Sequence, residues 1–459
     1  MKRYSISYLT LYMILVLLFT ACKKQDEFLD ARTNINLTVP STINDFQQLL
    51  NNENLFNNND PGLGTLTSEE FYPINATWLL ASTVDRNAYM FASDIYQGSG
   101  DYSDWTAPYQ AIYVCNVVLD GIANMDISSE NKATLQGIKG RALFYRAWKF
   151  FGLLQTFSLP GDSSTFTNKD GIPLRLSSDF NEKVPRSKIK TCYDQIIADT
   201  KEAAALLPTT VQYPTMPSQA AAYGFLARVY LSLGNYDSAF LYSDNALQMT
   251  NSLTDYNEVN TAAYPTFSSG YVAEDIFHST INPYNFLTIG YTSVDSVLLA
   301  SYNVNDLRRE AFFTARPIGT ITFKGTYDYK RRAYSGIATD ELYLTRAECE
   351  ARRGNILSAL DDINHLLSHR FKTGSYVPLS ITDKDDIIDI VLMERRRELI
   401  FRGLRWLDLR RLNIKSSTAE TLLRHFASLA YTLAPKDSKY AMPIPPTEIE
   451  LSGISQNQR

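Results

Sequence analysis

One unit of the chain occurs twice, and this duplication constrains the fold more than any other feature. The segment from Tyr223 reads YGFLARVYLSLGNYDSAFLYSDNAL, and the segment from Tyr343 reads YLTRAECEARRGNILSALDDINHLL. Each has two helix-like stretches separated by a Gly-Asn turn, with alanines where two helices would cross closely. This spacing predicts tetratricopeptide-like helix pairs. The defining positions recur at an offset of 120 residues: Tyr223, Ala227, Gly234 and Ala239, then Tyr343, Ala347, Gly354 and Ala359.

The rest of the chain divides into further helical stretches and two long irregular ones. Residues 105–124, 141–157 and 187–207 carry apolar residues at helical spacing. Residues 51–104 and 251–335 are instead rich in Asn, Gly, Ser, Thr and Tyr. Loops of that length in a compact chain usually carry function. We therefore expect a mostly helical, all-α fold in which a tetratricopeptide-like scaffold bears two large, aromatic-rich insertions.

The N-terminus predicts export and a lipid anchor. Lys2 and Arg3 precede an apolar run over residues 11–19, which is too short to span a membrane and has the length of a signal-peptide core. The run ends in Phe-Thr-Ala-Cys, which resembles the lipobox of a bacterial lipoprotein. We expect residues 1–21 to be a lipoprotein signal peptide and Cys22 to be lipidated. The alternative is a plain secretory signal followed by an incidental cysteine.

Composition favours packing and stacking over acid–base catalysis. The 459 residues include 29 Tyr, 23 Phe and 4 Trp beside only 4 His, and the net charge is −5. Without a basic cluster, a nucleic-acid partner is excluded. The cysteines Cys115, Cys192 and Cys349 are odd in number and widely spaced among apolar residues, so we expect buried free thiols.

A search for reactive motifs gives little. The chain has no G-x-S-x-G, H-E-x-x-H, Gly-rich phosphate loop or G-x-G-x-x-G. His365 and His369 are spaced to share a metal, but no supporting ligand stands near them in sequence. Asp383, Asp385 and Asp386 resemble a calcium loop without its glycine, and capping of a helix is the better interpretation. Carboxylate pairs for glycoside hydrolysis stay open, because sequence does not show their separation.

The densest polar motif covers residues 394–411, ERRRELIFRGLRWLDLRR. Opposite charges three and four residues apart predict ion pairs within and between helices. Arg405 and Asp408 share a helix face, and Trp406 offers a platform for Leu and Arg contacts. A catalytic interpretation would need a nucleophile or base. We interpret the segment as a helix that locks the repeats to the rest, and we assign Trp148 and Trp406 to the scaffold.

With these motifs in place, the chain resembles the SusD/RagB family of surface nutrient-binding lipoproteins from Bacteroidetes over nearly its whole length. The chain departs from the family pattern at two places, and both bear on local packing only. Arg402 stands where an acid usually precedes Gly403. Cys349-Glu350 stands where the family usually has a pair of small residues. The matching segments are the lipobox with Phe28-Leu29-Asp30, then Trp105, Tyr109, Ile112 and Asn116, Arg141 to Tyr145, Pro185-Arg186, Tyr193 to Leu207, Asn305 to Arg308, Glu341 to Gly354, Glu394 to Arg411, and Met442 to Pro445 with Glu448-Ile449 and Gln456-Asn457.

The resemblance implies a non-enzymatic capture protein. Such a protein sits on a SusC-like TonB-dependent outer-membrane transporter, binds an oligosaccharide and hands it to the pore. It implies one SusD-like domain over residues 22–459, with an N-terminal part to about 250 and a C-terminal part from about 251. It also implies attachment to the outer membrane, and Lys23 to Glu27 resemble a tag for the extracellular side. We expect no cofactor and no metal.

Sugar rings stack on aromatic side chains, and amides bond their hydroxyl groups, so we place the ligand site in the two insertions. Each aromatic candidate could instead be a packing residue. A peptide is the alternative cargo; a surface-anchored hydrolase and a scaffold that binds only protein are the competing classes. The candidates are Tyr72, Asn75, Trp78, Tyr96, Tyr102 and Trp105 in and after the first insertion, and Tyr284, Asn285, Phe286 and Tyr291 in the second.

Overall fold

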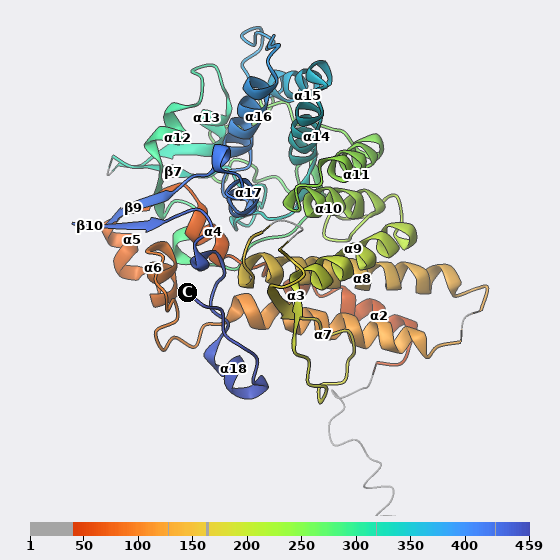
Figure 1. Ribbon diagram of the computed structural model, residues 1–459. Helices are drawn as coiled ribbons and strands as arrows, with labels where there is room; N and C mark the ends of the chain where they lie inside the picture. Colours follow the sequence, from red (N-terminus) through yellow and green to blue (C-terminus); the bar gives the residue numbers. More distant parts are fainter. Residues whose placement is uncertain (1–39, 127, 162–164, 318, 427) are drawn as a thin grey trace, which may run out of the picture. The chain divides into compact units, whose positions relative to one another are not determined.

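The computed structural model describes residues 40–459 except 127, 162–164, 318 and 427 (Figure 1). The predicted signal peptide, Cys22, the tag after it and the Phe28-Leu29-Asp30 motif lie outside the described residues. The chain divides into residues 1–45 and a compact unit of residues 46–459. Every element from α3 onward belongs to that second unit.

Helices dominate the described part of the chain, as the sequence predicts. In chain order they are α2 (Ile43–Leu50), α3 (Glu53–Phe56), α4 (Leu63–Ser68), α5 (Asn75–Leu80), α6 (Thr83–Tyr89), α7 (Ser103–Ala123), α8 (Lys132–Phe157), α9 (Ile189–Leu206), α10 (Gln219–Ser232), α11 (Tyr236–Met249), α12 (Ser296–Ala300), α13 (Arg308–Phe312), α14 (Thr339–Arg353), α15 (Ile356–Ser368), α16 (Lys384–Glu398), α17 (Leu404–Leu412) and α18 (Pro446–Ser452). Short 3-10 turns are η1 (Asn285–Leu287), η2 (Ser416–Thr418) and η3 (Ser438–Tyr440).

The duplicated unit forms two helix pairs, α10–α11 and α14–α15. Gly234 and Gly354 adopt left-handed backbone conformations, with φ of 68° and 86°, where the first helix of each pair ends. A glycine reaches this conformation without the clash that a Cβ atom would cause. Ala239 and Ala359 are fully buried where the paired helices approach each other. The structure confirms the prediction of tetratricopeptide-like pairs.

The other long helices extend this stack. Helix α8 packs against α7 and α9, α10 packs against α9 and α11, and α14 packs against α11, α15 and α16 (Figure 1). Helix α8 begins at Lys132, nine residues before the predicted start. The described part of the chain contains no helix long and apolar enough to cross a membrane. Cys115, Cys192 and Cys349 are free and buried, as predicted.

Strands are few and short, and one small sheet joins the two insertions. It is antiparallel, in the order β1-β5-β7-β6. Strand β1 comes from the first insertion, and the other three strands of the sheet come from the second, more than 200 residues later. The strands are β1 (Phe71–Pro73), β2 (Asp170–Pro173), β3 (Arg186–Lys188), β4 (Asp275–Phe277), β5 (Thr292–Val294), β6 (Phe313–Ala315), β7 (Ile321–Phe323), β8 (Ile337–Ala338), β9 (Leu422–Phe426) and β10 (Leu429–Leu433), of which β2–β3, β4–β8 and β9–β10 form separate antiparallel pairs.

The charged segment 394–411 carries a buried ion-pair network, which confirms its structural role. The prediction of a single helix was wrong: α16 ends at Glu398, and α17 begins at Leu404 after Gly403, which has a left-handed backbone conformation. Arg411 binds Glu348 of α14 at 2.7 Å, and Arg395 binds Asp408 at 3.0 Å, so α14, α16 and α17 are joined. Arg402 pairs with Asp340 at 2.8 Å. These charges are satisfied inside the protein, which is the condition under which buried ions are tolerated.

The two tryptophans assigned to the scaffold are buried. Trp148 donates a hydrogen bond to Asp60 at 2.9 Å, and Trp406 donates one to the carbonyl of Gln155 at 2.9 Å. The ring of Trp406 stacks on Tyr440 with 5.0 Å between ring centres. Both rings are therefore part of the packed scaffold.

Candidate functional site

The two insertions meet at one exposed aromatic surface. Strand β1 pairs with β5 so that Tyr72 lies opposite Ser293, two residues after Tyr291 in the chain. Tyr72 and Tyr291 are each 43% exposed. Helix α5 begins two residues after β1 and adds Leu79 and Leu80, which are also exposed. We call Tyr72, Asn75, Trp78, Leu79, Leu80 and Tyr291 the α5 surface.

Specific hydrogen bonds hold this surface in place. The hydroxyl of Thr77 donates to the carbonyl of Tyr291, and the hydroxyl of Tyr72 donates to Asp295. The hydrogen bond to Asp295 and partial burial raise the pKa of Tyr72 to about 12. Asn285 donates to the carbonyl of Leu80 at 2.5 Å, so this predicted polar partner closes the C-terminal end of α5. The hydroxyl of Tyr72 and the backbone of Tyr291 are thus held in place before any ligand arrives.

Trp78 is partly covered by a residue that sequence reasoning missed. Phe426, at the end of β9, stacks on Trp78 with 3.6 Å between ring centres and 22° between ring planes. Phe286 lies on the buried side, with its ring centre 5.9 Å from that of Trp78. No local signal in the sequence connects Phe426 to Trp78, because the two residues are nearly 350 positions apart.

Four predicted aromatic residues lie in the core instead of on the surface. Phe286 is fully buried, and Tyr96, Trp105 and Tyr284 are at most 5% exposed. The hydroxyl of Tyr96 donates to the carbonyl of Pro443 at 3.1 Å, and Trp105 donates to Glu448 at 3.3 Å. These C-terminal partners bury the rings. We therefore leave these four residues out of the α5 surface.

Tyr102 is partly exposed, between the buried candidates and the exposed ones. It precedes the first residue of α7, and its ring meets Tyr96 edge-on at 4.9 Å between centres. The next turn carries Asp104, whose carboxylate accepts hydrogen bonds from the backbone amides of Gly62 and Leu63 at 2.8 and 2.7 Å. It also accepts one from Asn282 at 2.7 Å. Asp104 therefore ties the start of α7 to both insertions.

Burial raises the pKa of Asp104 to about 6, although these hydrogen bonds oppose that rise. Sequence reasoning missed Asp104. An acid in the first turn of a helix is an ordinary capping signal and does not reveal distant partners.

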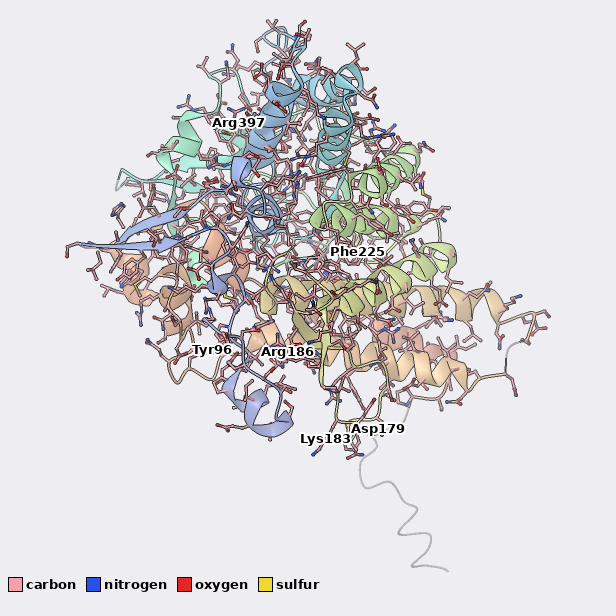
Figure 2. All side chains as sticks on the ribbon, viewed as in Figure 1. Tyr96, Asp179, Lys183, Arg186, Phe225 and Arg397 are labelled. Carbon is pink, nitrogen blue, oxygen red and sulfur yellow. The ribbon has the colours of Figure 1, made fainter. Side chains whose placement is uncertain are left out.

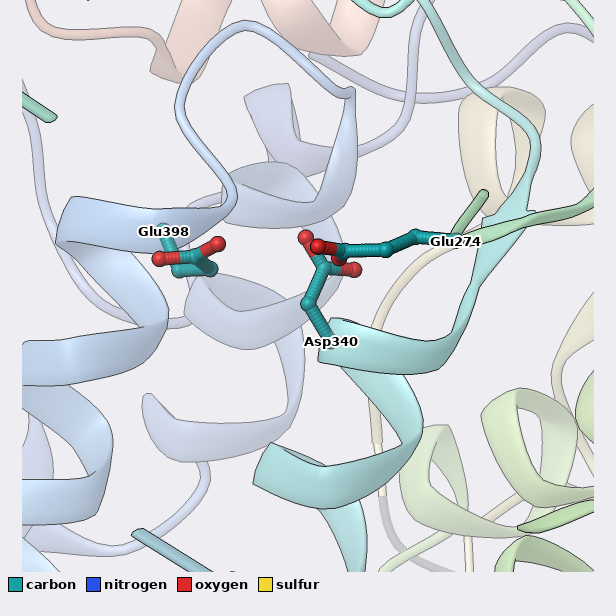
Figure 3. A group of neighbouring side chains, drawn as sticks. All are labelled: Glu274, Asp340 and Glu398. Atoms are coloured by element: carbon teal, nitrogen blue, oxygen red, sulfur yellow. The ribbon is translucent and has the colours of Figure 1, made fainter. Parts of the chain in front are cut away.

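Among the described residues, three carboxylates that come close to one another lie inside the protein. Figure 3 shows Glu274, Asp340 and Glu398, whose carboxylate oxygens lie within 4.8 Å of one another. All three are buried, and Arg370 binds both Glu274 at 2.9 Å and Glu398 at 2.8 Å. Burial opposes ionisation of Glu398, but Arg370 and Arg308 outweigh it and hold its pKa below the ordinary value. Guanidinium groups thus supply the positive charge beside these buried carboxylates.

The remaining metal candidates from the sequence have structural explanations. His365 and His369 lie on and just after α15, where the backbone carbonyl of His365 contacts Nδ1 of His369 at 2.9 Å. Asp383 caps α16 by accepting from the amides of Asp385 and Asp386 at 2.8 and 3.0 Å. The aspartate cluster is therefore a helix cap, as interpreted from the sequence.

Two family models match the chain. The first, described as starch-binding associating with outer membrane, covers residues 27–231. The second, described as SusD family, covers residues 326–458. The chain belongs to the SusD family. A curated relative is SusD-like protein P2 of Formosa agariphila, which is 25% identical over 374 residues, or 68% of this chain and 71% of that protein.

Solved SusD-family structures share the fold. A SusD superfamily protein from Bacteroides thetaiotaomicron matches with a TM-score of 0.73 and 22% identity, covering 91% of this chain and all of that one. A sugar binding protein of Bacteroides vulgatus gives 0.72 and 22%, covering 92% and 99%. Surface glycan-binding protein A of Bacteroides uniformis gives 0.68 and 17%, covering 91% and 99%. At these identities the likeness establishes the fold.

Proposed function

We propose that this chain is a non-enzymatic capture protein that binds an oligosaccharide on the α5 surface. The observation that carries the proposal is the pair of half-exposed tyrosines, Tyr72 and Tyr291, brought together from distant insertions by the β1–β5 pairing. The hydroxyl of Tyr72 is held by Asp295, and the backbone carbonyl of Tyr291 is held by Thr77. Sugar rings present apolar C–H faces that stack on such rings. Asn75, exposed at the start of α5, adds an amide that bonds hydroxyl groups.

Membership of the SusD family supports the proposal that this binding step belongs to nutrient import. Two of the similar structures are named as sugar-binding or glycan-binding proteins, which supports a saccharide as the cargo. We propose that Cys22 carries a lipid anchor in the outer membrane, that the chain faces the extracellular side, and that it delivers its cargo to a SusC-like TonB-dependent transporter. We further propose that residues 22–459 act as one SusD-like domain.

An affinity-gel screen with residues 23–459 tests the binding step. Gels containing neutral and acidic polysaccharides report retention, and analysis of released products reports cleavage. The proposal predicts retention without cleavage. Product release would establish a surface hydrolase. If no polysaccharide gel retains the protein and peptides bind it, the cargo is a peptide and not a saccharide.

Variants test where the ligand binds. Tyr72→Ala and Tyr291→Ala should each weaken retention, because each removes an exposed ring without removing the β1–β5 backbone pairing. Loss of one stacked ring should cost about 1 kcal/mol or more, or several-fold in Kd. Trp78→Ala with Tyr102→Ala should also weaken binding while the helical circular dichroism stays unchanged. Tyr213→Ala is the matched control, since Tyr213 is 49% exposed but lies outside the α5 surface. Unchanged retention in all α5-surface variants would refute the site.

A further inference from the structure

A second hollow lies along α7, apart from the α5 surface. Its volume is about 840 Å³, and its walls come from α7, the segment joining β2 to β3, and α18. A neighbouring hollow of about 310 Å³ shares three lining residues with it, Tyr109, Arg175 and Phe180. We call the two hollows together the α7 groove. Each hollow has a size typical of small-ligand sites.

Three aromatic residues follow one face of α7 along this groove. Trp105, Tyr109 and Tyr113 are spaced four residues apart, so their side chains lie above one another on the helix. The rings of Trp105 and Tyr109 have centres 4.9 Å apart. Exposure rises from 3% at Trp105 to 46% at Tyr113. Phe180, on the loop opposite, is 76% exposed. The groove therefore has a buried aromatic floor and an open aromatic rim.

The loop that bears Phe180 is anchored to α7. Asn116 donates to the backbone carbonyls of Arg175 and Ser177 at 2.9 and 3.1 Å, and the amide of Ser178 donates to Asp120 at 2.8 Å. In Figure 2, Asp179 and Lys183 lie near the tip of this loop, and Arg186 lies closer to the body of the protein. The groove wall is thus a fixed part of the fold.

Two cations in the groove are available to a ligand. Among the described residues, neither the guanidinium of Arg175 nor the ammonium of Lys183 has a hydrogen-bond or ion-pair partner. Arg175 lines both hollows together with Tyr109, whereas Lys183 lines only the larger one. Arg186 is different, because its guanidinium already donates to the carbonyls of Gly171 at 2.8 Å and Ser455 at 3.0 Å.

The charge of the groove is close to balanced. The larger hollow is lined by three basic and three acidic side chains: Asp170, Arg175, Glu182, Lys183, Arg186 and Glu448. The smaller hollow adds the acidic side chain of Asp179. A groove with both donors and acceptors, little net charge and exposed aromatic rings matches a ligand that is neutral, rich in hydroxyl groups and apolar on its ring faces.

We propose that the α7 groove is a second saccharide-binding site, which takes a neutral oligosaccharide. Tyr113 and Phe180 stack on sugar rings at the open rim, and Arg175 donates hydrogen bonds to hydroxyl or ring oxygens. This inference rests on the proposed function, because it assigns the same ligand class to a second place on the molecule. With two sites, one chain would hold two saccharides, or two segments of a long one.

Isothermal titration calorimetry on the full-length chain tests the groove. The probes are neutral hexasaccharides of glucose, xylose and mannose. The variants are the double substitution Tyr113→Ala with Phe180→Ala, and separately Arg175→Gln. All three positions are at least partly exposed, so the fold does not depend on them. Tyr72→Ala with Tyr291→Ala removes the α5 surface, and Tyr213→Ala is the control.

The proposal predicts two sites per chain for a hexasaccharide that binds. The groove variants should weaken one site at least about tenfold and leave the other, and the α5-surface variant should do the reverse. One site per chain, lost in the α5-surface variant and unchanged in the groove variants, would overturn the groove while leaving the proposed function intact. If the chain has one site and only the groove variants lose it, the α7 groove is a saccharide site and the assignment of a site to the α5 surface is wrong. Absence of binding by every hexasaccharide would overturn both.

Discussion

At the scale of single residues, burial decides which aromatic side chains can meet a ligand. Tyr96 and Trp105 have the same residue types as Tyr72 and Trp78 and lie in the same stretch of chain. Partners from the C-terminal segment nevertheless cover them: Pro443 bonds Tyr96, and Glu448 bonds Trp105. The residue types predicted an aromatic site, but a local pattern does not report contacts made over 340 residues later.

A histidine in the core gives a residue-scale prediction. His278 contacts Asp275 at 2.5 Å and Asp328 at 3.4 Å. Burial alone would lower its pKa, but the hydrogen bonds and negative charges of the two aspartates outweigh burial and raise the pKa from 6.5 to about 9. A raised folded-state pKa contributes stability that is complete below about pH 6.5 and is lost as pH rises through about 9.

His278→Gln should therefore lower the free energy of unfolding by more at pH 6 than at pH 10, with a difference on the order of 2 kcal/mol. Urea unfolding of both chains at the two pH values measures this. His425→Gln, at an exposed position on β9, is the control and should change stability equally at both. A His278→Gln effect that does not vary with pH would contradict the assignment.

At the scale of elements, the helix pairs were predictable and the sheet was not. The turn glycines and crossing alanines are local, so the sequence predicts α10–α11 and α14–α15 directly. Pairing of β1 with β5 joins three-residue strands over 200 positions apart, and strands this short carry no periodic signal. The α5 surface depends on that pairing. The sequence therefore predicted a set of candidate aromatic residues, but it did not predict which of them lie together on the surface.

The junction of α14, α16 and α17 gives an element-scale prediction. Glu348 of α14 is fully buried and binds Arg411 and Arg352 at 2.7 and 2.8 Å. Burial alone would raise its pKa, but Arg411 and its neighbours lower it to about 2. Glu348→Gln leaves buried guanidinium groups short of a counter-charge and should cost about 3–5 kcal/mol of unfolding free energy at pH 7.

The depressed pKa means that Glu348 stabilises the fold above about pH 4.5 and that this contribution is lost as pH falls towards 2. Chemical unfolding measures the cost. Glu202→Gln is the matched control: it breaks an exposed pair with Lys139 and should cost less than about 1 kcal/mol. Equal effects of the two substitutions would mean that the buried network does not hold the helices together.

At the scale of the whole molecule, a rigid helical stack carries two insertions whose meeting point is exposed and aromatic. Asp104 fastens the start of α7 to both insertions, and the β1–β5 pairing fastens them to each other. Such an arrangement presents a preformed surface to a ligand, so that little conformational entropy is lost on binding. This is the physical basis for treating the chain as a capture protein.

Hydrogen exchange measured by mass spectrometry, with and without a saturating saccharide retained in the affinity screen, tests this account most directly. The account predicts slower exchange in two segments that are far apart in sequence, residues 72–80 and 285–294, at the same ligand concentration. Tyr72→Ala with Tyr291→Ala should abolish both effects. Saccharide binding that leaves exchange in these two segments unchanged would contradict the central claim.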